Sequence, residues 1–159
     1  MIAVTGIPAI DEFNESNPLA LVIAMLLDQQ VPMEKAFRGP YDLKERMGGR
    51  LDAGEIASMD AEELAVLFKG PPALHRYPGS MAGRTQELCR LLVERYDGRP
   101  ENLWADAPDG ATLLKRVGEL PGFGAQKSKI FVALLGKQYG VTPPGWREAA
   151  GDYGLEGAR

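Results

Sequence analysis

The sequence predicts an all-α fold, and three observations lead to that prediction. Signals for β-strands are nearly absent, because apart from residues 1–7 the chain has no run of alternating β-branched residues. Signals for helices are frequent, since apolar residues recur with helical spacing behind capping residues. Proline and glycine stand at the corners between these segments, where they favour turns.

The central helix is predicted over residues 18–27. Asn17 is a good N-cap residue, and Pro18 suits the first helical position. Residues 19–27 are apolar on every face, which indicates a buried helix. The helix ends in the polar sequence Asp28-Gln29-Gln30.

Shorter helices are predicted on either side of this one. Asp52 and Asp60 stand in capping position ahead of two of them. A loop over residues 70–79 precedes a long amphipathic helix, which Asp97-Gly98 ends. The further predicted helices cover residues 32–37, 40–47, 52–59, 60–68, 80–96 and 110–119, and the chain after residue 140 is predicted to be irregular.

Length and composition favour a compact protein in the cytoplasm. The chain has 159 residues, of which 45% are apolar, and we predict one domain over residues 1–159, with two small lobes sharing a core as the alternative. An apolar run of about 18 residues and a secretory signal are both lacking, so we expect no membrane partner. Cys89 is the only cysteine and is expected in the core, which excludes a disulfide, an iron–sulfur cluster and a four-thiolate zinc site within this chain.

The charge pattern points to one basic region in an acidic protein. The net charge of −4 and the pI near 5.1 argue mildly against a nucleic-acid partner. The segment 111–140 is different, because it holds five basic residues and a single acid, Glu119. A local field of one sign can attract a polyanion even when the total charge does not. The five basic residues are Lys115, Arg116, Lys127, Lys129 and Lys137.

The most informative motif is a hairpin over about residues 110–135, with Leu120-Pro121-Gly122-Phe123-Gly124 between two predicted helices. Two glycines let the backbone turn sharply and leave N–H groups bare at the start of the second helix. Bare N–H groups and the helix dipole favour an anion together, so the motif predicts a phosphate site. The alternative is a structural corner, which such short motifs often are. The residues assigned to this phosphate site are Gly122, Phe123, Gly124, Gln126, Lys127 and Ser128.

This hairpin resembles the helix-hairpin-helix of the HhH-GPD superfamily of base-excision DNA glycosylases, which includes endonuclease III and 3-methyladenine glycosylase II. Residues 25–31 resemble the end of the family helix that fills the gap left by an extruded base, and residues 77–88 resemble a helix start facing the same cleft. The resemblance covers roughly residues 17–140 and is greatest to a bacterial subgroup. It implies a helical glycosylase fold, incomplete at the C-terminus if the chain is truncated.

The resemblance also implies a function and its residues. A glycosylase takes its target base out of the stack, and Gln29 or Gln30 would fill the hole. Tyr77, Met81 and His75 would line the base pocket. Duplex DNA is the expected partner of a monomeric, nucleoid-associated protein. No cofactor is required, and side chains supply no metal ligands, although hairpin carbonyls would accept a K⁺ or Na⁺ ion beside the phosphate.

The sequence departs from the family pattern at two positions. Bifunctional members carry a lysine nucleophile where this chain has Gln126, and Lys127 is turned by about 100° from that direction. We therefore expect a monofunctional glycosylase that uses water, with lyase activity doubtful. The family aspartate is expected within residues 142–146, which contain no acid, so the candidate is Asp152 or a residue beyond Arg159.

Three functions therefore remain open from the sequence. The first is a DNA glycosylase, whose preferred base the sequence does not reveal. The second is a DNA-binding module that has the hairpin and no catalytic acid. The third is a helical protein in which the Pro-Gly turns are only architecture. An acid facing the hairpin distinguishes the first from the second, and salt-sensitive binding to DNA distinguishes both from the third.

Overall fold

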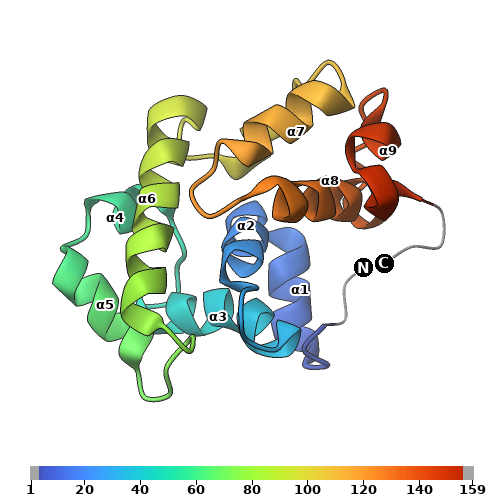
Figure 1. The fold of residues 1–159 in the computed structure, drawn as a ribbon. Helices are drawn as coiled ribbons and strands as arrows, with labels where there is room; N and C mark the ends of the chain where they lie inside the picture. Colours follow the sequence, from blue (N-terminus) through green and yellow to red (C-terminus); the bar gives the residue numbers. More distant parts are fainter. Residues whose placement is uncertain (1–3, 156–159) are drawn as a thin grey trace. The chain divides into compact units, whose positions relative to one another are not determined.

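The computed structural model describes residues 4–155, and every regular element in that range is helical (Figure 1). The all-α prediction is confirmed. These residues divide into two compact units, 4–100 and 101–155. The single domain over residues 1–159 stays a prediction. Among the described residues, none of the helices is long and apolar enough to cross a membrane.

Helix α2 (Pro18–Leu27) is the core of the first unit. Its nine residues from 19 to 27 are all buried, as the apolar run predicts. The side chain of Asn17 accepts a hydrogen bond from the Ala20 amide at 3.1 Å and caps the helix. Helices α1 (Pro8–Ser16) and α3 (Met33–Arg46) pack against it.

Two of the predicted boundaries in this unit are wrong. Residues 32–37 and 40–47 were expected to form two helices, but α3 runs through both and contains Pro40. Packing on α2 explains why the helix continues, because Gly39 lies so close to Leu27 that a Cβ there would stand 2.6 Å from its Cδ1. Helix α1 was not predicted, although Pro8 stands at its start.

Helix α6 (Pro78–Tyr96) packs against α4 (Ala53–Ser58) and α5 (Ala61–Lys69). The carboxylates of Asp52 and Asp60 cap α4 and α5 as expected, accepting amide hydrogen bonds at 2.9 and 3.2 Å. Cys89 of α6 is fully buried, which confirms it as a core residue. Burial, and to a lesser degree the charge of Asp52, raises the pKa of its thiol to about 12.

The second unit contains the hairpin helices α7 (Gly110–Gly118) and α8 (Ala125–Tyr139). The chain after residue 140 is not wholly irregular, because it forms the short helix α9 (Trp146–Ala149) and the 3₁₀ turn η2 (Gly151–Gly154). Trp146 lies directly on Gly136 of α8, where any Cβ would come within 2.4 Å of its ring. A further 3₁₀ turn, η1 (Pro100–Leu103), lies where the first unit ends.

Candidate nucleic-acid interface

The hairpin reverses the chain between α7 and α8 at Gly122. This residue has φ +82°, in the left-handed region that favours glycine. The Phe123 amide donates to the Leu120 carbonyl at 3.1 Å and closes the turn. Gly124 has an extended backbone and serves as the N-cap of α8. Of the two positions, only Gly122 therefore needs glycine for its backbone conformation.

Three consecutive backbone N–H groups, those of Gly124, Ala125 and Gln126, stand at the start of α8. Within residues 4–155 none of the three donates to another backbone group, as expected for a first helical turn. All three residues are exposed. A Cβ added to Gly124 would meet nothing within 4 Å, so the space beside this residue is open. The arrangement suits an anion.

The side chains of Phe123 and Ser128, two of the predicted DNA-binding residues, are buried within the hairpin. The Phe123 side chain is only 4% exposed, and its ring packs edge-on against Phe131 with centroids 5.8 Å apart. Ser128 is 2% exposed, and its hydroxyl donates to the Phe123 carbonyl at 3.3 Å. Its amide donates to the Gly124 carbonyl at 2.9 Å. These two buried side chains therefore hold the hairpin in shape, and a DNA-binding role for the two residues stays a prediction.

The side chains of Gln126 and Lys127 diverge, as one step along a helix requires. The Gln126 amide group donates to the hydroxyl of Tyr153 in η2 at 2.8 Å. The Lys127 ammonium lies 5.9 Å from the centroid of the Phe123 ring. The position expected for a lysine nucleophile thus carries an amide that bonds a tyrosine, and no amine.

Asp152, the candidate catalytic acid, is exposed on η2. It directly precedes Tyr153, whose hydroxyl accepts the Gln126 hydrogen bond, and η2 packs against α8. This turn therefore lies at the N-terminal end of α8, where the bare amides are. Sequence reasoning missed Tyr153, which shows no motif of its own.

The basic segment of the hairpin offers fewer cations than its sequence indicates. Arg116 donates to the Asp106 carboxylate at 2.7 Å and to the Leu103 carbonyl at 3.2 Å, so its charge is committed within the unit. The hydrogen bond from Arg116, and then its charge, lower the pKa of Asp106. Lys115 and Lys129 are exposed.

In the first unit, Gln29 and Gln30 form a turn directly after α2. The Gln29 amide donates to the Leu27 carbonyl at 2.7 Å, which starts the turn. Gln30 has φ +59°, a conformation that residues other than glycine rarely adopt. Gln30 is exposed, whereas the side-chain oxygen of Gln29 accepts a hydrogen bond from Arg84 of α6 at 3.2 Å.

The buried side chain of His75 contacts the backbone of this glutamine turn. Its side chain is 1% exposed, and its Nε2 lies 3.0 Å from the Leu27 carbonyl and 2.9 Å from the Gln29 carbonyl. Its Nδ1 accepts a hydrogen bond from the Tyr77 amide at 3.0 Å. An acceptor at Nδ1 fixes the tautomer with the proton on Nε2, which then donates to the two carbonyls. The imidazole thus satisfies backbone groups at the end of a buried helix.

The loop that carries His75 is itself fixed by two cations of α3. Lys35 donates to the Ala73 carbonyl at 2.9 Å. Arg46 donates to the carbonyls of Leu67 and Pro72, both at 2.6 Å. Both charges therefore bind backbone oxygens in or beside the loop that carries His75. Neither Arg46 nor Arg84 could be assigned these roles from sequence, because their partners lie more than 20 residues away.

The three predicted pocket residues have different environments. Tyr77 is 42% exposed at the start of α6, so its ring is accessible. Met81 is buried in the core, and His75 has both ring nitrogens engaged. The side chains of His75 and Met81 are thus covered, whereas that of Tyr77 is not, and the assignment of these three residues to the base pocket stays a prediction. The remaining predicted residues fall into two groups, the glutamine turn in one unit and the hairpin in the other.

Metal ligation by side chains has no support within the described part of the chain. Residues 4–155 contain no group of three or more His, Cys, Asp or Glu side chains that could hold a metal ion. In the hairpin, the carbonyl oxygens of Pro121 and Gly122 accept no hydrogen bond from another described residue. Oxygen donors of this kind are compatible with a monovalent cation.

Comparison with known proteins identifies the fold. No protein-family model matches the chain, and no curated protein matches it. Among solved structures, it is similar to endonuclease III trapped in a covalent intermediate with DNA, an estranged-adenine complex, with a TM-score of 0.51 and 22% identity. The match covers 84% of this chain and 60% of the endonuclease III chain, so this chain spans less than two thirds of that length. The described helices therefore share the fold of endonuclease III.

Proposed function

We propose that this protein is a monofunctional DNA base-excision glycosylase. The observation that carries the proposal is the row of exposed amides at the start of α8 that donate to no other backbone group among residues 4–155, in a chain whose fold is that of endonuclease III. A backbone phosphate of duplex DNA would bind the amides of Gly124, Ala125 and Gln126. The carbonyls of Pro121 and Gly122 would hold a K⁺ or Na⁺ ion, which would neutralise part of that phosphate charge when bound.

The glutamine turn would contact the DNA stack. In this proposal the Gln30 side chain fills the gap left by the flipped base, because it is exposed, whereas the Gln29 side chain is held by Arg84. The left-handed backbone of Gln30 and the buried His75 support this assignment, since both preset the turn before DNA binds. Tyr77 is the pocket residue that the proposal retains.

Hydrolysis of the glycosidic bond would use water. Water oxygen bonds to C1′ of the sugar while the C1′–N bond breaks, and the base departs with its electron pair and takes up a proton. The carboxylate of Asp152 would stabilise the positive charge that develops on the sugar and accept a proton from the water. The amide at position 126 supports water over an enzyme amine as the nucleophile.

A specific observation also supports a second function, binding without catalysis. Residues 142–146 carry no acid, and Asp152 is exposed on a short turn where no neighbouring group holds its carboxylate among the described residues. A protein with the hairpin alone would bind duplex DNA and leave the base attached. Turnover distinguishes the two functions.

The decisive experiment is a turnover assay on duplexes that each carry one altered base: uracil, hypoxanthine, an oxidised purine or an alkylated purine. Alkali treatment cleaves the strand at an abasic product, and the same reaction without alkali detects lyase activity. We expect cleavage only after alkali for at least one duplex. Asp152→Asn should lower that rate at least a hundredfold, or about 2.7 kcal/mol in the barrier. Tight binding with no abasic product on any duplex supports the non-catalytic alternative.

A matched pair of glycine variants tests the phosphate site. Gly124→Ala adds a methyl group where the protein leaves space but where a phosphate would approach, so the fold should persist and DNA affinity should fall about tenfold. Gly54→Ala in α4, outside every segment assigned to DNA, is the control and should bind normally; its added methyl group would lie 3.3 Å from the Asp52 carboxylate. Unchanged affinity of the Gly124 variant would contradict the proposed phosphate contact.

A further inference from the structure

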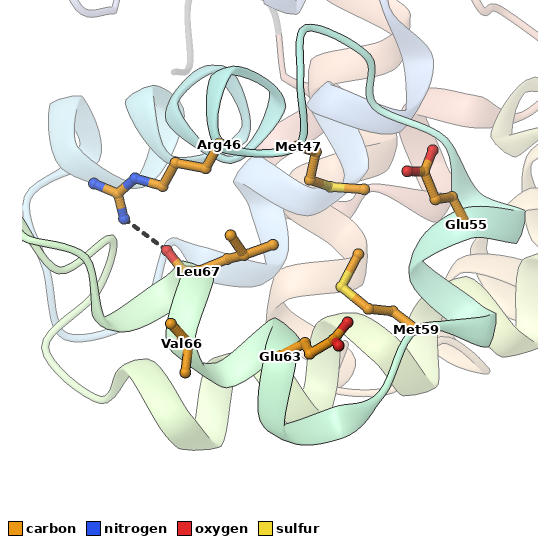
Figure 2. A pocket seen from close by; sticks show the side chains of 7 residues that line it. All are labelled: Arg46, Met47, Glu55, Met59, Glu63, Val66 and Leu67. Carbon is orange, nitrogen blue, oxygen red and sulfur yellow. Dashed lines mark hydrogen bonds between the residues drawn. The ribbon is translucent and has the colours of Figure 1, made fainter.

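A shallow groove lies on the first unit between the end of α3, α4 and α5. Its volume is about 440 Å³, within the range of sites that accept a ligand or a few side chains of a partner. Figure 2 shows the methionines Met47 and Met59 pointing toward each other inside it. The lining residues are Arg46, Met47, Glu55, Met59, Glu63, Val66 and Leu67.

The groove presents apolar side chains where a surface would ordinarily be polar. Val66 is 63% exposed and is one of the most exposed large apolar side chains of the described chain. Met47, Met59 and Leu67 are partly exposed beside it. Methionine side chains are flexible and polarisable, so a floor with two of them adapts to different apolar partners.

The charge of the groove is negative. Glu55 and Glu63 are exposed at its edge, and neither forms an ion pair with a described residue. Arg46 is the single basic lining residue, and its guanidinium is committed to the carbonyls of Leu67 and Pro72. Residues 52–63 contain five acids and no lysine or arginine. The acids are Asp52, Glu55, Asp60, Glu62 and Glu63.

We propose that this groove docks a basic amphipathic segment of a partner protein. An apolar side chain of that segment would lie on Met47, Met59 and Val66, and lysines or arginines beside it would pair with Glu55 and Glu63. The acidic edge disfavours nucleic acid and anionic lipid, both of which carry negative charge. It also disfavours the same groove of a second copy. The inference is independent of the proposed glycosylase function.

The test uses the full-length protein and three synthetic 16-residue peptides. The first places leucines on one helical face and lysines on the other. The second replaces every lysine by glutamate, and the third replaces every leucine by serine. Methyl NMR spectra recorded during titration should show shifts at Met47, Met59, Val66 and Leu67 with the first peptide. The other two peptides should bind at least tenfold more weakly.

Variants then locate the interaction. Glu55→Gln combined with Glu63→Gln should weaken binding of the first peptide about fivefold and reduce its salt dependence. Val66→Lys removes an exposed apolar contact and adds a repelling charge, so it should weaken binding at least tenfold. The matched control changes two exposed glutamates of α1, Glu12→Gln with Glu15→Gln, and should leave binding unchanged.

Four results would each overturn the proposal. They are shifts confined to methyl groups outside the groove, equal binding of the glutamate peptide, concentration-dependent self-association that the Val66 variant abolishes, and no binding of the first peptide at millimolar concentration. Circular dichroism of each variant verifies that the helices are intact before the titration.

Discussion

The hairpin and the glutamine turn present polar groups in two different ways. The hairpin presents backbone amides, and the contacts that shape it are local: the hydroxyl of Ser128 bonds a carbonyl five residues back. The glutamine turn presents a side chain; the backbone of the turn is held by His75, 46 residues from Gln29, and the Gln29 side chain by Arg84, 55 residues away. One surface is therefore encoded within residues 120–128, and the other only in the folded unit.

This difference has a consequence for stability. A substitution that removes a long-range support leaves several buried backbone groups without partners, whereas a substitution in the hairpin alters mainly one residue's conformation. We therefore expect the glutamine turn to be coupled strongly to the stability of its unit. The hairpin should tolerate change at exposed positions with small effects on folding.

The largest expected effect is that of His75→Ala. The carbonyls of Leu27 and Gln29 and the amide of Tyr77 would lose a partner, and the side chain would leave a cavity. We expect the free energy of unfolding to fall by about 3 kcal/mol, measured by urea denaturation. His75→Gln keeps a donor and an acceptor and should lose less. A loss below about 1 kcal/mol for the alanine variant would show that the histidine is not a support.

Gly122→Ala should give the next largest loss of stability, and it tests the hairpin as His75→Ala tests the glutamine turn. A Cβ at φ +82° costs about 1–2 kcal/mol, because the left-handed region is unfavourable for L-residues. Gly124→Ala in the same loop has an unstrained φ of −73° and should cost at most about 1 kcal/mol. Thermal unfolding of both variants measures the difference. Equal losses would mean that the turn does not depend on the first glycine.

Arg84→Met sharpens the comparison, because it releases the Gln29 side chain without removing a buried support. The variant loses the 3.2 Å hydrogen bond to Gln29 and should destabilise the protein by less than about 1 kcal/mol. We expect the Gln29 side chain to become more mobile. Its side-chain amide signals should therefore narrow toward those of an exposed glutamine in NMR spectra. Unaltered signals would show that Arg84 does not restrain this residue.

The smallest expected effect is a pH dependence at the start of α7. Hydrogen bonds from the side chain of Thr112, and then from its backbone amide, lower the pKa of the exposed Asp109 carboxyl. A lowered folded pKa stabilises the protein above the unfolded pKa near 4, and this contribution disappears as the pH falls through the folded value. Asp109→Asn should therefore show a slightly shallower loss of stability below pH 4. An identical pH profile would indicate that the cap contributes nothing.

Local rules explain which parts of the fold were predictable. Asn17, Asp52 and Asp60 cap helices with their own side chains, and the apolar run after Asn17 is buried throughout, so these elements follow from short-range patterns. The continuity of α3 through Pro40 does not, because it depends on how closely Gly39 approaches a different helix.

The same distinction applies to the candidate site. The bare amides of the hairpin are a property of any helix start after a glycine turn, and the sequence indicates them directly. The role of His75 could not be predicted, since a single histidine in a loop has no pattern that reveals its burial or tautomer. Tyr153 was missed for a similar reason, because its bond to Gln126 spans 27 residues.

The state of Cys89 makes the native chain convenient for site-specific labelling. Its thiol is buried and remains protonated at neutral pH, so a maleimide dye should not react with the folded protein. A cysteine introduced at the exposed Gln30 would then be the single reactive thiol, and a fluorophore attached there would respond to its immediate surroundings. The proposed contact of this turn with a DNA duplex could then be tested in real time without first replacing the natural cysteine.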